Sequence, residues 1–137
     1  MMRSLMETPS STSCSPETVD AWRELRERHA RVSCALDKSL QDEHHLSTSE
    51  FDVLEFLATA PRDHDQQRMQ DLADAVHLSQ SAVSRLVGRL EERELITRSI
   101  CSQDRRGINA CLTDAGRSRY DEALPTHRRI LGELFVG

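Results

Sequence analysis

Aromatic residues, lysine and long apolar runs are scarce in this sequence of 137 residues. Aromatic residues make up 4% of the chain, which argues against the base-stacking surfaces of proteins that bind single strands or RNA. No apolar run approaches the roughly 18 residues of a membrane span, and the N-terminus lacks the apolar segment of a secretory signal. We therefore expect one globular domain in the cytoplasm, with no membrane partner.

Charge is unevenly distributed along the chain. The formal net charge of −5 argues at face value against a nucleic-acid partner. Residues 80–106 nevertheless hold six arginines against four acidic residues, a local charge of +2, so the rest of the chain carries −7. Lys38 is the single lysine, so contacts with phosphate or carboxylate groups would be made by planar, bidentate guanidinium groups. The acidic total thus conceals a basic segment.

The first part of the chain combines a polar tail with a long helix. Residues 1–14 are rich in Ser, Thr and Pro without an apolar period, which predicts a flexible tail. Ser15 followed by Pro16 is typical of a helix start. Apolar residues then recur at three- and four-residue steps from Trp22 to Leu40, which predicts one long helix within residues 15–45. A helix of this length requires a partner surface beyond a single small core.

Two further patterns predict a second helix and a helix-turn-helix. Ser47 and Glu50 have the spacing of a capping box, and residues 62–67 form a polar loop after the second helix. From Met69 onward a short helix, a corner at His77 and a second amphipathic helix follow the helix-turn-helix pattern. His77 stands where glycine is common, because the corner needs a positive φ that His adopts more readily than most residues.

The period of apolar residues then changes from 3.6 to 2. Residues 95–100 and 108–112 are strand-like runs separated by a charged turn, which predicts a β-hairpin. Thr113 caps a final helix, in which Pro125 predicts a kink or a local break. The predicted fold is mainly α with a small β-hairpin wing: a winged helix-turn-helix over residues 46–113, with long helices at both ends.

The candidate nucleic-acid contacts lie on the second helix of the helix-turn-helix and at the hairpin tip. Polar side chains opposite the buried stripe of that helix would enter the major groove, and an arginine at the tip would enter the minor groove. Asp104 would support the tip by an ion pair with one of its arginines. The alternative interpretation is that the polar side chains form an ordinary solvated helix face, and that the charged residues of the hairpin form an ordinary turn. The predicted DNA contacts are Gln80, Ser81, Ser84, Arg85, Arg89, Arg105 and Arg106.

Several motifs in combination resemble the MarR family of bacterial transcription regulators: LSTSEFDVL at 46–54, LSQSAVSRLV at 78–87, DRR at 104–106 and LTDAG at 112–116. The resemblance covers residues from about 20 to the end. It implies a homodimer formed by the helices in 15–45 and 114–137, a pseudo-palindromic DNA operator, and usually repression relieved by a small ligand. Family members usually continue into a further helix, so we expect the C-terminal dimerisation helix of this chain to be truncated.

The resemblance also implies a place for an effector. Ligand-responsive members bind phenolic or carboxylate compounds between the dimer helices and the winged domain. The candidates by position are Trp22, Arg26, His29 and Phe51. Packing of Trp22 and His29 in a dimer interface is an equally good interpretation.

Oxidation would be a different means of regulation. The alternative places Cys101 and Cys111 across from one another on the hairpin strands, where a disulfide would distort the wing and weaken DNA binding. In a reducing cytosol, free thiols are the default expectation.

Metal binding, protein binding and catalysis are the remaining alternatives. His44, His45, His127 and Cys34 are possible metal ligands, but they match zinc-responsive relatives only at scattered positions, so we expect solvated histidines and no metal or cofactor. A winged helix can also bind protein rather than DNA. No nucleophile, base and orienting residue share a local motif, so we do not expect an enzyme.

Overall fold

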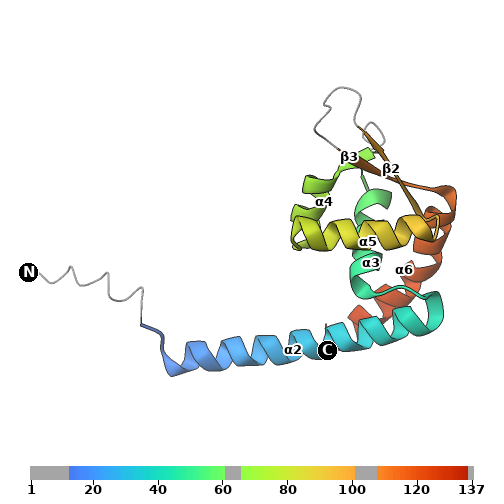
Figure 1. Ribbon diagram of the computed structural model, residues 1–137. Helices are drawn as coiled ribbons and strands as arrows, with labels where there is room; N and C mark the ends of the chain where they lie inside the picture. The colour runs from blue at the N-terminus through green and yellow to red at the C-terminus, as the bar shows by residue number, and fades with distance from the viewer. Residues whose placement is uncertain (1–12, 61–65, 101–107, 136–137) are drawn as a thin grey trace, which may run out of the picture.

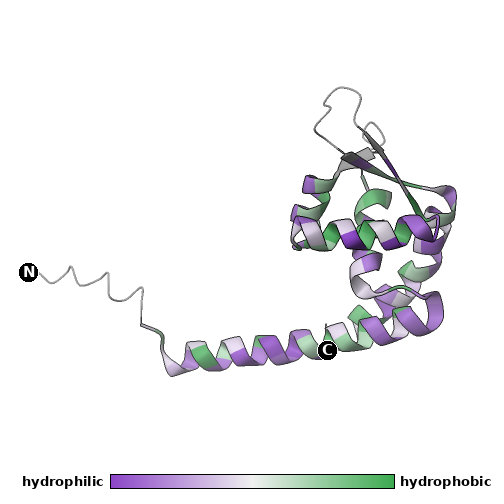
Figure 2. Ribbon diagram, in the orientation of Figure 1, coloured by the Kyte–Doolittle hydropathy of each residue, from purple (hydrophilic) through white to green (hydrophobic). Residues whose placement is uncertain are grey.

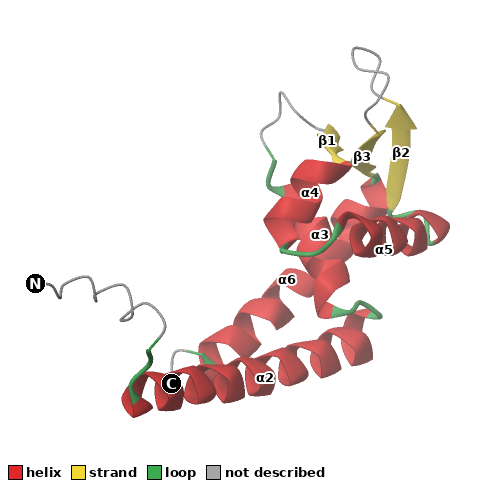
Figure 3. Ribbon diagram, turned by 60° about the vertical axis from the view of Figure 1, so that its left-hand side comes forward, coloured by secondary structure: helices red, strands yellow, loops and turns green. Residues whose placement is uncertain are grey.

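The computed structural model describes residues 13–60, 66–100 and 108–135. Three helices and a small sheet form a winged unit, and the two longest helices extend from it as an arm (Figures 1 and 3). The described helices are α2 (Pro16–His44), α3 (Thr48–Ala58), α4 (Met69–Val76), α5 (Gln80–Glu92) and α6 (Asp114–Leu134). The described strands are β1 (Gln66–Arg68), β2 (Ile96–Ile100) and β3 (Ile108–Leu112). The predicted order of four helices, a hairpin and a helix is confirmed.

The helices begin where the sequence predicts. The Ser15 hydroxyl accepts a hydrogen bond from Thr18 N at 3.2 Å, with Pro16 in the first turn of α2. At α3 both bonds of the predicted capping box are present, with Ser47 N donating to Glu50 Oε1 at 2.8 Å. Each such cap satisfies amide groups that the helix itself leaves without partners, a contribution of about 1 kcal/mol.

The main core lies inside the winged unit and extends to both arm helices. Phe51, Leu72 and Leu90 are fully buried there, each burial stabilising the fold by roughly 1.5–3 kcal/mol. Tyr120 of α6 and Leu40 of α2 belong to the same cluster, so the arm is anchored in this core. A second, smaller cluster of Val32, Leu36 and Ile130 packs α2 against α6 along the arm.

The sheet has the strand order β1-β3-β2, and all described pairings are antiparallel. The β2–β3 hairpin is confirmed. Strand β1 was not predicted, because its polar residues read as part of a loop; the free edge of β3 recruits it, with Gln66 opposite Cys111. On the other side Cys111 is paired with Thr97. Cys101, which the redox alternative places across from Cys111, lies outside the described residues.

Helix α6 runs without interruption through Pro125, so the predicted local break is absent. Pro125 is exposed, so water can satisfy the backbone carbonyl one turn earlier that loses its amide donor. Among the helices the structure describes, none combines the length and the apolar composition needed to cross a bilayer.

Candidate nucleic-acid interface

Helix α5 presents a polar face to solvent and an apolar face to the core. Gln80, Ser81, Arg85 and Arg89 are exposed, and Ser84 is half-buried. The opposite face carries the four buried residues of the helix: Val83, Leu86, Val87 and Leu90. Figure 2 shows this alternation of hydrophilic and hydrophobic residues along α5. All five predicted contacts on this helix are thus brought together beside the hairpin.

The corner before α5 fixes how the helix begins. Leu78 N donates to Ala73 O at 3.1 Å, and His77 has a φ of 60°, the conformation expected at the corner. Ser79 caps α5 by accepting from Ala82 N at 3.2 Å, and its hydroxyl lies 3.3 Å from that of Ser81. The positive end of the α5 dipole is therefore exposed among hydroxyl groups, an arrangement suited to anions such as phosphate.

Arg98 ties the hairpin to α5. Its Nη2 atom donates to Ser84 O at 2.9 Å, and its Nε atom lies 3.3 Å from Glu91 Oε1. A Cβ atom added at Gly88 would lie 3.3 Å from Arg98 Nη2, so the small residue leaves room for this arginine. Arg98 contributes to the basic segment in the sequence, but the fold uses its charge internally.

Glu50 forms ion pairs with two further arginines of the basic segment. Its Oε2 atom lies 3.5 Å from Arg89 Nε, and its Oε1 atom lies 3.6 Å from Arg93 Nη1. Arg93 also donates to His45 O at 2.6 Å. The sequence predicts Arg89 as a DNA contact and Glu50 as a residue of the capping box, but not the ion pair between them. The two residues are 39 positions apart in the chain, and only the tertiary fold brings them together.

The predicted contacts at the hairpin tip, Arg105 and Arg106 with the supporting Asp104, lie outside the described residues. Strand β2, which packs beside α5, and strand β3 flank this segment in the chain (Figure 3).

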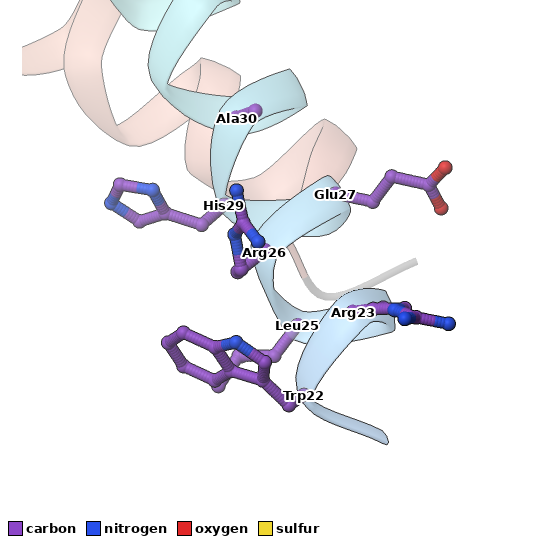
Figure 4. Close-up of a pocket in the computed structure, with 7 residues that line it drawn as sticks. All are labelled: Trp22, Arg23, Leu25, Arg26, Glu27, His29 and Ala30. Atoms are coloured by element: carbon purple, nitrogen blue, oxygen red, sulfur yellow. The ribbon is translucent and has the colours of Figure 1, made fainter. Parts of the chain in front are cut away.

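The predicted effector residues are divided between two environments. Figure 4 shows Trp22, Arg26 and His29 on one side of α2, and the Arg26 guanidinium lies 6.0 Å from the Trp22 ring centre. The described residues lining this surface all belong to α2, and Trp22 is 57% exposed. Phe51, in contrast, is fully buried in the winged unit, so the structure does not join it to the other three.

Two histidines expected to be solvated are packed at the junction of arm and winged unit. The ring of His127 is buried and stacks on Phe51 at 4.3 Å between centres. Burial lowers the pKa of His127, and the adjacent Arg128 lowers it further. His44 is half-buried and hydrogen-bonded to Thr126 Oγ1 at 2.8 Å. The expectation fails because tertiary packing, which periodicity does not reveal, covers both rings; His45 is exposed.

A carboxylate cluster lies beside these histidines. Glu55 accepts hydrogen bonds from Tyr120 and from Arg128, joining α3 to α6. Burial, together with the charge of Glu55, raises the pKa of the Asp52 carboxyl from 3.8 to about 6. Burial and the hydrogen bond to Glu55 raise the pKa of Tyr120. Asp52 and Glu55 line a cavity of about 500 Å³ between α3, the end of α4 and α6.

The helix pair, its exposed polar face and the flanking hairpin define a winged helix-turn-helix fold. The model of the MarR family matches residues 44–107. AbsC, a MarR family transcriptional regulator from Streptomyces coelicolor, is 30% identical and superposes with a TM-score of 0.81 over 90% of this chain and 82% of its own. Sco3205, another MarR family regulator from that organism, solved in complex with DNA, is 29% identical with a TM-score of 0.82, covering 89% of this chain and 75% of its own.

A curated relative, the HTH-type transcriptional repressor MdtR of Bacillus subtilis, is 30% identical over 76 residues. The match covers 56% of this chain but 49% of MdtR, so the chain spans about half the length of that repressor. These three relatives are regulators rather than enzymes. The chain belongs to the MarR family.

Proposed function

We propose that this chain is a homodimeric transcriptional regulator that binds double-stranded DNA in a sequence-specific manner, as a repressor relieved by a small effector. The observation that carries the proposal is the exposed polar face of α5, held between a helix-turn-helix corner and a hairpin. The DNA complex of the Streptomyces coelicolor relative supports this assignment. Because bacterial DNA lies in the cytoplasm, the protein would act there.

In this proposal the first turns of α5 enter the major groove. Gln80 suits adenine edges, Ser81 and Ser84 suit bases or phosphates, and Arg85 suits guanine or a phosphate. Arg105 and Arg106 at the hairpin tip would approach the minor groove, where narrow A·T-rich segments attract arginine. The acidic surface elsewhere would disfavour wrong orientations of the protein on the duplex.

Operator binding by Arg85→Ala tests the proposal. We expect this variant to bind DNA from upstream of its own gene more weakly by about 1–3 kcal/mol, as for the loss of a bidentate contact. Arg117→Ala, which removes an exposed arginine of α6, is the matched control. Fluorescence anisotropy over a range of salt concentrations measures the affinity for the operator and its salt dependence. Binding that involves phosphates weakens steeply as the salt concentration rises. Salt-independent binding, or equal affinity of both variants, would favour a protein-interaction module instead.

The exposed end of the arm supports the homodimer. Helix α6 ends beside Arg28, whose guanidinium lies 5.2 Å from the centre of the Phe135 ring, so residues 16–27 of α2 extend past it. Trp22 and Leu25 in this extension are each 57% exposed, which is costly for large apolar side chains unless a second surface covers them.

The effector would bind near the same surface. An indole ring, a guanidinium group and an imidazole on one side of α2 suit an aromatic compound with a carboxylate or phenolate group. Titration of the operator complex with salicylate tests this: release of DNA by the wild type but not by Arg26→Ala supports the site, and equal release from both contradicts it.

A further inference from the structure

We propose that Glu50 is a specificity-determining positioning residue, which restrains Arg89 and Arg93 and so reduces binding to DNA of the wrong sequence. The inference rests on the proposed DNA-binding function. It concerns a side chain that would not itself touch the DNA, because the Glu50 side chain is 8% exposed.

The first argument is the geometry of the carboxylate. Glu50 Oε1 accepts from Ser47 N at 2.8 Å, which fixes the side chain in the capping box of α3. The same carboxylate lies 3.5 Å from Arg89 Nε through one oxygen and 3.6 Å from Arg93 Nη1 through the other. A buried, doubly paired carboxylate with a fixed rotamer is a rigid anchor for the long Arg89 side chain and a further partner for Arg93, which also donates to His45 O.

The second argument is the difference in exposure between the two partners. The Arg89 side chain is 56% exposed, whereas that of Arg93 is 33% exposed and is also held by His45 O. Arg93 is therefore mainly a link between α5 and the junction of α2 with α3. Arg89 can still reach a phosphate, but only from the direction that its Nε contact with Glu50 permits.

The consequence concerns discrimination between DNA sequences. A freely moving arginine binds phosphates of any sequence, and this sequence-independent term dominates non-specific affinity. A restrained arginine binds well only when the phosphate arrives in the register set by correct base contacts. Glu50 also competes with phosphate for Arg89, which weakens every complex in which that register is absent.

Glu50→Gln isolates this effect. Glutamine retains the acceptor that the capping box needs, but loses the charge that restrains both arginines. Asp42→Asn is the matched control, since it also removes one negative charge from an ion pair, on the exposed face of α2. Each protein is measured on a duplex selected by the wild type from a random library, and on a scrambled duplex of equal length and composition.

We expect Glu50→Gln to bind the scrambled duplex about three- to tenfold more tightly, with a salt dependence steeper by about one counterion. The ratio of affinities for the selected and scrambled duplexes should fall at least threefold. Asp42→Asn should leave that ratio unchanged within twofold. A ratio for Glu50→Gln within twofold of the wild type, or a change matched by Asp42→Asn, overturns the inference. A lower melting temperature with an unchanged ratio also overturns it, because it would assign Glu50 a purely structural role.

Arg89→Lys gives a second test that leaves Glu50 and the capping box intact. Lysine keeps the positive charge but cannot face Glu50 with one nitrogen and a phosphate with others, so the ratio should again fall. Wild-type discrimination by this variant overturns the inference. Failure of the wild type to select any sequence from the library contradicts the proposed function itself, whereas selection without an effect of Glu50 contradicts this inference alone.

Discussion

In the part of the chain that the structure describes, three residues other than glycine adopt positive φ angles at helix ends: His45, His77 and Glu94, with φ values of 57°, 60° and 63°. This conformation brings the Cβ atom close to the following carbonyl oxygen, at a cost of roughly 1–2 kcal/mol for an ordinary residue. Glycine avoids the contact but makes the unfolded chain more flexible, which offsets about 0.5–1 kcal/mol of the gain. The balance favours glycine at positions where the side chain itself contributes little.

Glu94→Gly should therefore stabilise the fold by about 0.5–1 kcal/mol. Glu94 is exposed, and its structural contacts use the backbone: its carbonyl accepts from Thr113 Oγ1 at 2.8 Å. Urea unfolding measures the change. Glu122→Gly, the same substitution at an exposed position inside α6, should destabilise by about 1 kcal/mol. If both variants lose stability equally, the positive φ carries no strain.

Asp52 should make stability depend on pH. Its pKa is raised from 3.8 to about 6, chiefly by burial, so the folded state binds the proton more tightly than the unfolded chain. Stability consequently falls as pH rises from about 4 to about 6, and stays lower above that range. Asp52→Asn mimics the protonated form and should stabilise the protein by up to about 1 kcal/mol at pH 7.5, allowing for solvent screening.

At pH 4 that gain should largely disappear, because Asp52 of the wild type is itself protonated in the folded state. Denaturant midpoints at the two pH values give the comparison. Asp20→Asn, at an exposed position of α2, is the control and should show little dependence on pH. A gain from Asp52→Asn that is the same at both pH values would contradict the expectation.

Among the elements, α6 begins in close contact with the base of the hairpin. A Cβ atom at Gly116 would lie 2.1 Å from the backbone oxygen of Leu95, which cannot move without disturbing the strand that follows it. That oxygen also accepts from Thr113 N at 3.1 Å. The absence of a side chain at Gly116 therefore allows α6 to begin directly against the base of the hairpin.

Gly116→Ala should accordingly destabilise the protein by more than about 2 kcal/mol, since the clash is with backbone. Gly132→Ala in the same helix is the matched control. Nothing lies within 4 Å of a Cβ atom there, so alanine should stabilise by about 0.5–1 kcal/mol. Thermal unfolding of the two variants should shift in opposite directions, and shifts of the same sign would contradict this account.

Short-range sequence patterns predicted the helices and the hairpin well, but they did not predict the contacts between residues far apart in the chain. The caps at Ser15, Ser47 and Thr113 depend on residues three positions away, so the sequence reveals them directly. Strand β1 depends on a partner more than forty residues later, and its polar residues carry no alternation that predicts pairing.

The candidate site follows the same rule. The outward face of α5 follows from helical periodicity, and so five of its predicted contacts lie together in the structure. The pairing of Arg89 with Glu50 and the burial of His127 arise from packing between distant segments. Neither has a signature in local spacing, so a single sequence does not reveal them.

On the scale of the whole molecule, the arm should hold two subunits together. Leu25→Asp places a charge on the exposed apolar end of α2 and should convert the proposed dimer to monomer at micromolar concentration, because burying an unpaired carboxylate is costly. Light scattering after size exclusion measures the mass. Gln41→Asp, at an exposed position near the other end of α2, should remain dimeric. Equal masses for both variants would show that the dimer interface does not include Leu25.

The length of α2 also has a mechanical consequence. With 29 residues, the helix is a stiff rod about 44 Å long, with the winged unit fixed at one end. A rotation of about 5° at that end displaces the other by roughly 4 Å, close to the 3.4 Å rise of one base pair. The contacts of His44 with Thr126 and of Arg93 with His45 lie at this fulcrum. Small adjustments there would thus change the separation of two α5 helices by a distance comparable to the rise of one base pair.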